Sequence, residues 1–101
     1  MSAQIEVDRG RLGEICRRYH VRKLAVFGSM LREDFRADSD VDLLIEFDPA
    51  SRPRMVGMYQ LEQELSSLFA GHKVDLVNPK YLNRRLRDRV LAEAEVQFAE
   101  G

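Results

Sequence analysis

Several residue types are scarce in this chain, and each shortage excludes a class of protein. The 101 residues include no tryptophan, three prolines and a single cysteine, Cys16. One cysteine cannot form an internal disulfide, and its place in a helical apolar stripe predicts a buried small side chain rather than a redox centre. No apolar run approaches the ~20 residues that a membrane-spanning helix needs, and the first residues do not resemble a secretion signal. We therefore expect a cytoplasmic protein that does not contact a membrane.

Net charge is also scarce. Sixteen Lys and Arg residues against 17 Asp and Glu residues leave a net charge of -1 at pH 7. Proteins that hold nucleic acid by general electrostatic attraction usually carry a net basic surface, so nucleic acid is not expected to be the main partner. A chain of this length has room for one hydrophobic core, and residues 1–101 are expected to form a single domain.

Hydrophobic periodicity predicts an alternation of helices and strands. Helices are expected over residues 8–20, from Ser29 to about residue 35, from Met55 to a cap at Gly71, and over residues 80–100. Strands are expected over residues 24–27, 43–47 and 73–77. The last helix is predicted from apolar residues that step by four, namely Leu82, Leu86, Val90, Ala94 and Phe98.

A small turn motif lies between the first predicted strand and the helix after it. Gly28 and Ser29 supply free backbone N–H groups, room for a phosphate to approach closely, and a hydroxyl donor. Arg32 lies three residues after Ser29, on the same side of the predicted helix, so the two side chains can converge on one polyphosphate. Taken alone, a Gly-Ser pair is typical of an ordinary tight turn, and Arg32 of a solvated surface charge.

Acidic residues follow this turn. Asp40 and Asp42 share one face of a predicted strand, roughly 6–7 Å apart, where bare carboxylates repel unless divalent cations such as a pair of Mg²⁺ ions lie between them. A calcium loop beginning at Asp38 is excluded, because it would need glycine and glutamate where Leu43 and Pro49 stand. An acidic turn at a strand edge remains the structural alternative.

A third carboxylate interrupts a later apolar strand. Asp75 stands between Val74 and Leu76, so it could face the first two carboxylates from a second strand. The structural alternative is an ion pair of Asp75 with Lys73 or with an arginine.

Together these residues resemble the minimal nucleotidyltransferase family of the DNA polymerase β superfamily. The resemblance covers nearly the whole chain and includes the order of strands and helices and the spacing between the turn and the acidic residues. Two positions depart from the family pattern. Leu31 replaces a usual small residue and Glu33 stands where the family commonly has glycine, so the phosphate turn is expected to be tighter or differently shaped. The residues that carry the resemblance are Gly28, Ser29, Arg32, Ser39, Asp40, Asp42 and Asp75.

The resemblance implies an α/β (α+β) nucleotidyltransferase fold, a small mixed sheet flanked by helices. It also implies ATP or another nucleoside triphosphate as donor, with two Mg²⁺ ions as cofactors. Asp40 and Asp42 would hold both metal ions, while Asp75 would hold the catalytic one and help deprotonate the acceptor hydroxyl. The residues implied to bind the nucleotide are Gly28, Ser29, Arg32 and Ser39.

The acceptor must be presented by another molecule, because the chain has no room for a substrate-binding domain. Small proteins of this kind resemble antitoxins that attach AMP to a tyrosine of a helical HEPN toxin. Candidate contact surfaces are the arginine-rich start of the last predicted helix, Met55 and Met58. Two alternatives stay open. One is a non-catalytic antitoxin, either nucleotide-binding or purely sequestering, which is favoured if Glu33 spoils triphosphate binding. The other is a small RNA-end nucleotidyltransferase, which the net charge and the missing RNA-binding domain disfavour. The base of the donor and the oligomeric state, including a homo-oligomer, are left open by the sequence.

Overall fold

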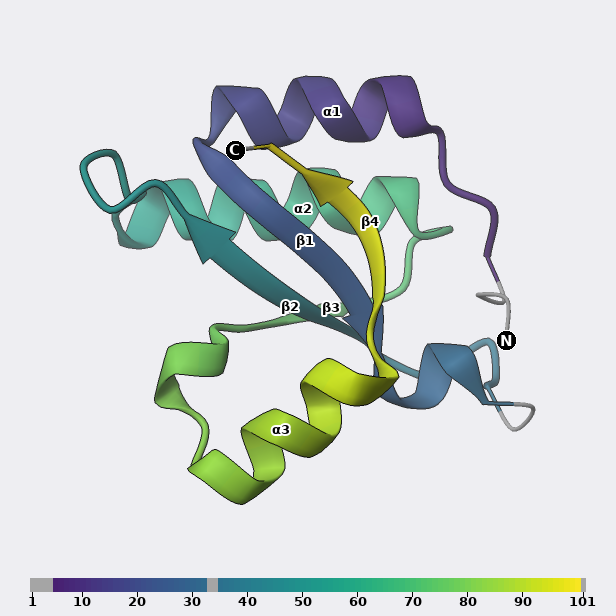
Figure 1. The fold of residues 1–101 in the computed structure, drawn as a ribbon. Helices are drawn as coiled ribbons and strands as arrows, with labels where there is room; N and C mark the ends of the chain where they lie inside the picture. Colours follow the sequence, from purple (N-terminus) through teal and green to yellow (C-terminus); the bar gives the residue numbers. More distant parts are fainter. Residues whose placement is uncertain (1–4, 33–34, 101) are drawn as a thin grey trace.

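A computed structural model describes residues 5–32 and 35–100 as a four-stranded mixed sheet with helices on both faces (Figure 1). The strand order is β3-β2-β1-β4, in which β2 and β3 pair parallel and the other two neighbouring pairs are antiparallel. The expected fold class is therefore confirmed. Within the described ranges, no helix has both the length and the hydropathy required to cross a bilayer. In chain order the elements are α1 (Arg9–Arg18), β1 (Val21–Phe27), the 3₁₀ helix η1 (Gly28–Leu31), β2 (Val41–Phe47), α2 (Met55–Leu68), β3 (Val74–Val77), the 3₁₀ helix η2 (Pro79–Tyr81), α3 (Arg84–Glu93) and β4 (Glu95–Ala99).

The two faces of the sheet are covered unequally. Helices α1 and α2 pack on one face and enclose the main core, to which β2 contributes Leu43 and Ile45. Helix α3 lies on the other face, where Leu44 meets Ala25 and Val90 in a smaller cluster. Because side chains alternate along a strand, Asp42 shares the α3 face with Leu44.

The ends of α1 and α2 follow from local sequence. The Asp8 side chain accepts a hydrogen bond from the Arg11 amide at 3.1 Å and caps α1, as predicted. After α2, Gly71 adopts a φ of 81° and its amide donates to the Ser66 carbonyl at 2.8 Å. In the core, burial raises the pKa of the Cys16 thiol to about 12. That thiol is fully buried, which confirms the predicted packing role.

The helix predicted over residues 80–100 is wrong. Its middle forms α3, but Ala94 has extended backbone angles (φ −65°, ψ 140°) and the chain continues as β4. Strand β4 pairs with the open edge of β1, where Leu24 faces Phe98 and Val26 faces Glu95. Val96 and Phe98 also fit a period of two, so the apolar pattern is compatible with a helix or a strand. The long-range pairing with β1 stabilises the strand.

The helix predicted from Ser29 to about residue 35 is also shorter than expected. Its described part is only the four-residue η1, which ends at Leu31. Strand β1, in contrast, begins three residues earlier than predicted, at Val21. The result is a tight corner between β1 and the segment that leads to β2.

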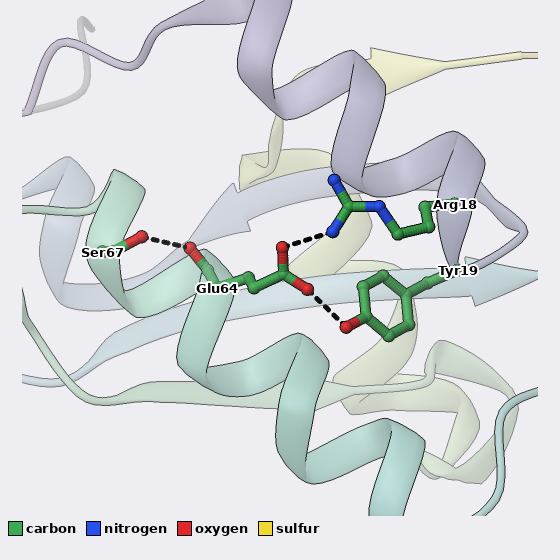
Figure 2. A network of polar contacts seen from close by, with 4 residues as sticks. All are labelled: Arg18, Tyr19, Glu64 and Ser67. Carbon is green, nitrogen blue, oxygen red and sulfur yellow. Dashed lines mark hydrogen bonds and ion pairs between the residues drawn. The ribbon is translucent and has the colours of Figure 1, made fainter.

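A polar network joins the end of α1 to α2 (Figure 2). Arg18 contacts Glu64 at 2.6 Å, and the Tyr19 hydroxyl donates to the second carboxylate oxygen of Glu64. The hydrogen bond from Tyr19 lowers the pKa of Glu64 below its ordinary 4.5, and the same bond raises the pKa of Tyr19. This network fixes the two helices that cover the main core against each other.

Replacing Tyr19 by Phe tests this network. The loss of one donor should lower the free energy of unfolding by about 1 kcal/mol at pH ~7. Because folding depresses the pKa of Glu64, its contribution is present above pH 4.5 and is lost as the pH falls through the folded-state pKa. Urea unfolding should therefore show a difference between wild type and Tyr19→Phe at pH ~7 that shrinks at pH ~3. Tyr59→Phe, at an exposed tyrosine of α2, is the control, and an undiminished difference in acid would contradict the assignment.

Candidate active site

The turn that ends β1 is built around the carboxylate of Asp42. Gly28 has a φ of 71°, a left-handed conformation that glycine adopts without strain. A Cβ atom at this position would lie 2.5 Å from Oδ2 of Asp42, closer than real contacts allow. Asp42 sits opposite Phe27 in the β1–β2 register, which brings its carboxylate to the start of the turn. A side chain at residue 28 would displace this carboxylate.

The second strand carboxylate lies beside the first. Asp42 and Asp75 are register partners on the parallel strands β2 and β3, and such strands lie about 4.8 Å apart. Both residues are partly buried. Among the described residues, Asp75 makes no ion pair, so the predicted structural alternative with Lys73 or an arginine is not formed. The structure thus places two carboxylates next to each other, as the sequence predicted.

The third predicted carboxylate is more peripheral. Asp40 is exposed and precedes the first residue of β2. In the described part of the chain, no three His, Cys, Asp or Glu side chains are arranged to hold a metal ion by themselves. Magnesium ions are commonly bound by one or two carboxylates together with substrate phosphates. Asp42 and Asp75 can supply these carboxylates. The assignment of all three aspartates as metal ligands remains a prediction.

His72, to which the sequence assigned no role, helps to hold the loop that leads to Asp40. The Ser39 hydroxyl accepts from the Arg36 amide at 2.9 Å, and the Ser39 carbonyl accepts from Nδ1 of His72 at 2.6 Å. The His72 ring also packs on Phe35, with centroids 4.8 Å apart. Both contacts hold Ser39 within its own turn, and its predicted role in nucleotide binding remains a prediction. His72 was missed because only the docking of the β3 segment beside this loop gives it a role.

The predicted phosphate-binding residues are brought together in part. Arg32 is exposed and shares a pocket with Gly28, so both predicted positions face one space. The side chain of Ser29 and the whole of Glu33 lie outside the described residues, so the predicted effect of Glu33 on the turn is not tested. The pocket has a volume of about 290 Å³ and is lined by Gly28, Leu31, Arg32, Glu93 and Glu95.

This arrangement suits the binding of a phosphate chain together with a cation. The Gly28 turn lets backbone N–H groups approach an anion closely, and Arg32 adds a fixed positive charge beside it. The Asp42 and Asp75 carboxylates, on the neighbouring strands, supply oxygen ligands for a hard divalent cation. A bound metal and phosphate would neutralise each other between these two groups of residues.

Comparison with known proteins agrees with this geometry. The family model described as polymerase beta, nucleotidyltransferase matches residues 11–100. The protein adenylyltransferase MntA of Thermococcus cleftensis is 38% identical over 80 residues, covering 79% of this chain and 78% of that protein. A solved structure of a candidate minimal nucleotidyltransferase is 37% identical, with a TM-score of 0.69 and coverage of 86% of each chain.

A more distant structure shares the fold alone. It is a chain of the complex between a tri-AMPylated Shewanella oneidensis HEPN toxin and its MNT antitoxin. The two chains are 19% identical with a TM-score of 0.55, over 91% of this chain and 70% of that one.

Two glycine substitutions test the contact between the turn and Asp42. Gly71→Ala should lower the free energy of unfolding by about 1 kcal/mol, because its φ is positive but no atom lies within 4 Å of the added Cβ. Gly28→Ala should lower it by about 2–4 kcal/mol, because the added Cβ also collides with the Asp42 carboxylate. Urea unfolding of both variants measures the difference. In an Asp42→Ala background the excess at Gly28 should disappear, and equal losses for the two single variants would contradict the contact.

Proposed function

Because this chain belongs to the polymerase beta nucleotidyltransferase family, we propose that it transfers AMP from ATP to a hydroxyl group of a partner protein. The observation that carries the proposal is the Asp42 carboxylate packed against the Gly28 turn, with Asp75 beside it on the next strand. The similarity to the protein adenylyltransferase MntA supports an adenylyl group as the group transferred and a protein as its acceptor.

Two groups of residues near the Gly28 turn would hold the donor nucleotide. Backbone N–H groups at Gly28 and the Arg32 guanidinium would bind the β- and γ-phosphates. Asp40, Asp42 and Asp75 would hold two Mg²⁺ ions jointly with the phosphates, since the carboxylates alone do not form a complete metal site in the described residues. When bound, Mg²⁺ would neutralise charge on the α-phosphate and on the pyrophosphate that leaves.

Asp75 would act on the acceptor. Its carboxylate would orient the attacking hydroxyl and take up its proton as the oxygen bonds to the α-phosphorus. The bond between that phosphorus and the bridging oxygen to the β-phosphate breaks at the same time, so that pyrophosphate leaves with that oxygen. Asp42 would keep the triphosphate in line for this displacement.

The acceptor would be a tyrosine of a helical HEPN-type toxin, for which the protein would be the antitoxin. Support comes from the fold shared with the chain from the AMPylated HEPN toxin complex. The start of α2 offers a surface for such a partner, since Met55, Val56 and Tyr59 are 86%, 71% and 63% exposed. The exposure of Met55 agrees with the predicted contact surface, whereas Met58 is half-buried.

A labelling experiment tests the proposed reaction and its acceptor together. The protein would be incubated with ATP labelled at the α-phosphate and either a HEPN-type partner from the same genome or bulk RNA. We expect label on the partner protein in the presence of Mg²⁺ and none with excess chelator, because the carboxylates and phosphates would otherwise repel each other. Label on RNA would replace the proposed acceptor, and tight partner binding without label would indicate simple sequestration.

Asparagine variants separate the roles of the aspartates. Asp40→Asn and Asp42→Asn should weaken Mg-ATP binding and abolish transfer, because each removes a ligand of the metal that carries the triphosphate. Asp75→Asn should retain most Mg-ATP binding but slow transfer by about 10²-fold or more, the usual effect of losing such a group. Calorimetry and single-turnover labelling under identical conditions measure both quantities. An Asp75→Asn variant that transfers at the wild-type rate would make this carboxylate structural.

A further inference from the structure

The pocket beside the Gly28 turn is also lined by two carboxylates, Glu93 and Glu95, that the proposed reaction does not use. Its walls come from two segments that are distant in sequence: the corner after β1, and the junction of α3 with β4. Figure 1 shows these two segments meeting where β1 ends. Its volume of about 290 Å³ is close to the lower end of the range of ~300–1,000 Å³ for small-ligand sites.

One wall of this pocket contains an unsatisfied carboxylate. Glu95 begins β4 and faces Val26 in the β1–β4 register, two residues before Gly28. Its Oε2 atom is buried and has no hydrogen-bond partner among residues 5–32 and 35–100. Such an oxygen is unfavourable because it has lost its water without gaining a donor. A group of this kind calls for an explanation, and an additional partner is the usual one.

The corner after β1, which also lines this pocket, contributes Arg32. Arg32 is exposed, and among the described residues its side chain makes no hydrogen bond or ion pair. A guanidinium group has five N–H donors in a planar fork. It can therefore bind a phosphate along one edge and a carboxylate along another at the same time.

We propose that Glu95 is a positioning residue for Arg32. When a triphosphate occupies the Gly28 turn, the Arg32 side chain turns into the pocket, where it bridges the terminal phosphates and the Glu95 carboxylate. The buried oxygen of Glu95 then gains its donor only in the nucleotide-bound state, which strengthens binding of the triphosphate relative to shorter nucleotides. This inference rests on the proposed function, because it requires the β- and γ-phosphates to lie at the turn.

The second carboxylate of the pocket provides a matched control. Glu93 is the last residue of α3 and lines the same space, but it is exposed, so water can satisfy it. Removing either carboxylate changes the charge near the phosphates by the same amount. Only the removal of Glu95 should remove a specific partner of Arg32.

The affinities for ATP and AMP distinguish a positioning role of Glu95 from a general effect of a carboxylate in the pocket. Calorimetry with Mg²⁺ would compare ATP and AMP binding to wild type, Glu95→Leu, Glu93→Leu, Arg32→Ala and the double variant Arg32→Ala, Glu95→Leu. We expect Glu95→Leu to weaken ATP binding about tenfold or more and to leave AMP binding unchanged, because AMP has no β- or γ-phosphate. Glu93→Leu should not weaken ATP binding, and the effect of Glu95→Leu should vanish in the Arg32→Ala background.

Stability without nucleotide gives a second readout. Glu95→Leu should unfold at the same or a higher temperature than wild type, because it removes a buried oxygen that lacks a donor. If Glu95→Leu does not fold, Glu95→Gln takes its place in both experiments. Equal weakening of ATP and AMP, an effect that persists without Arg32, or tighter ATP binding would overturn the positioning role. A wild-type protein that binds no ATP would instead overturn the proposed function.

Discussion

The approach of the Asp42 carboxylate to the Gly28 turn is the constraint on which the rest of the site depends. An oxygen of this carboxylate lies 2.5 Å from the place where a side chain at residue 28 would begin. The corner after β1 can therefore be tight only if residue 28 has no side chain, and Asp42 can face the corner only under the same condition. One contact between two strands would thus provide both the surface for a phosphate and the ligand for its cation that the proposed function requires.

The sheet and its helices hold this contact in place. The β2–β3 register puts Asp75 next to Asp42, while the hydrogen bond of His72 to Ser39 fixes the loop that precedes Asp40. Helices α1 and α2 cover the opposite face, so the carboxylates are left on the face that only α3 covers. The helices that enclose the main core thus lie on the face of the sheet opposite the site and do not cover it.

Local patterns in the sequence predicted most of this arrangement. The turn at Gly28, the strand that carries Asp42 and the helix that begins at Met55 depend on residues close together in the chain, and each is confirmed in the structure. Asp40, predicted on the same strand as Asp42, instead precedes the first residue of β2. Strand β4 was missed because its residues also fit a helical period, and only pairing with β1 decides between the two. His72 and Glu95 gain their surroundings from that same kind of long-range contact, which spacing in a single sequence does not reveal.

The location of a bound cation tests the central claim most directly. Manganese can replace magnesium, and it broadens the NMR signals of nearby amides because it is paramagnetic. With Mn²⁺ and ATP together, we expect the amides of Gly28, Asp42 and Asp75 to broaden first. Those of Phe47 and Asp48, at the far end of β2 from Asp42, should broaden least. Broadening that is strongest at that far end, or absent near Gly28, would contradict a cation held between the turn and the strand carboxylates.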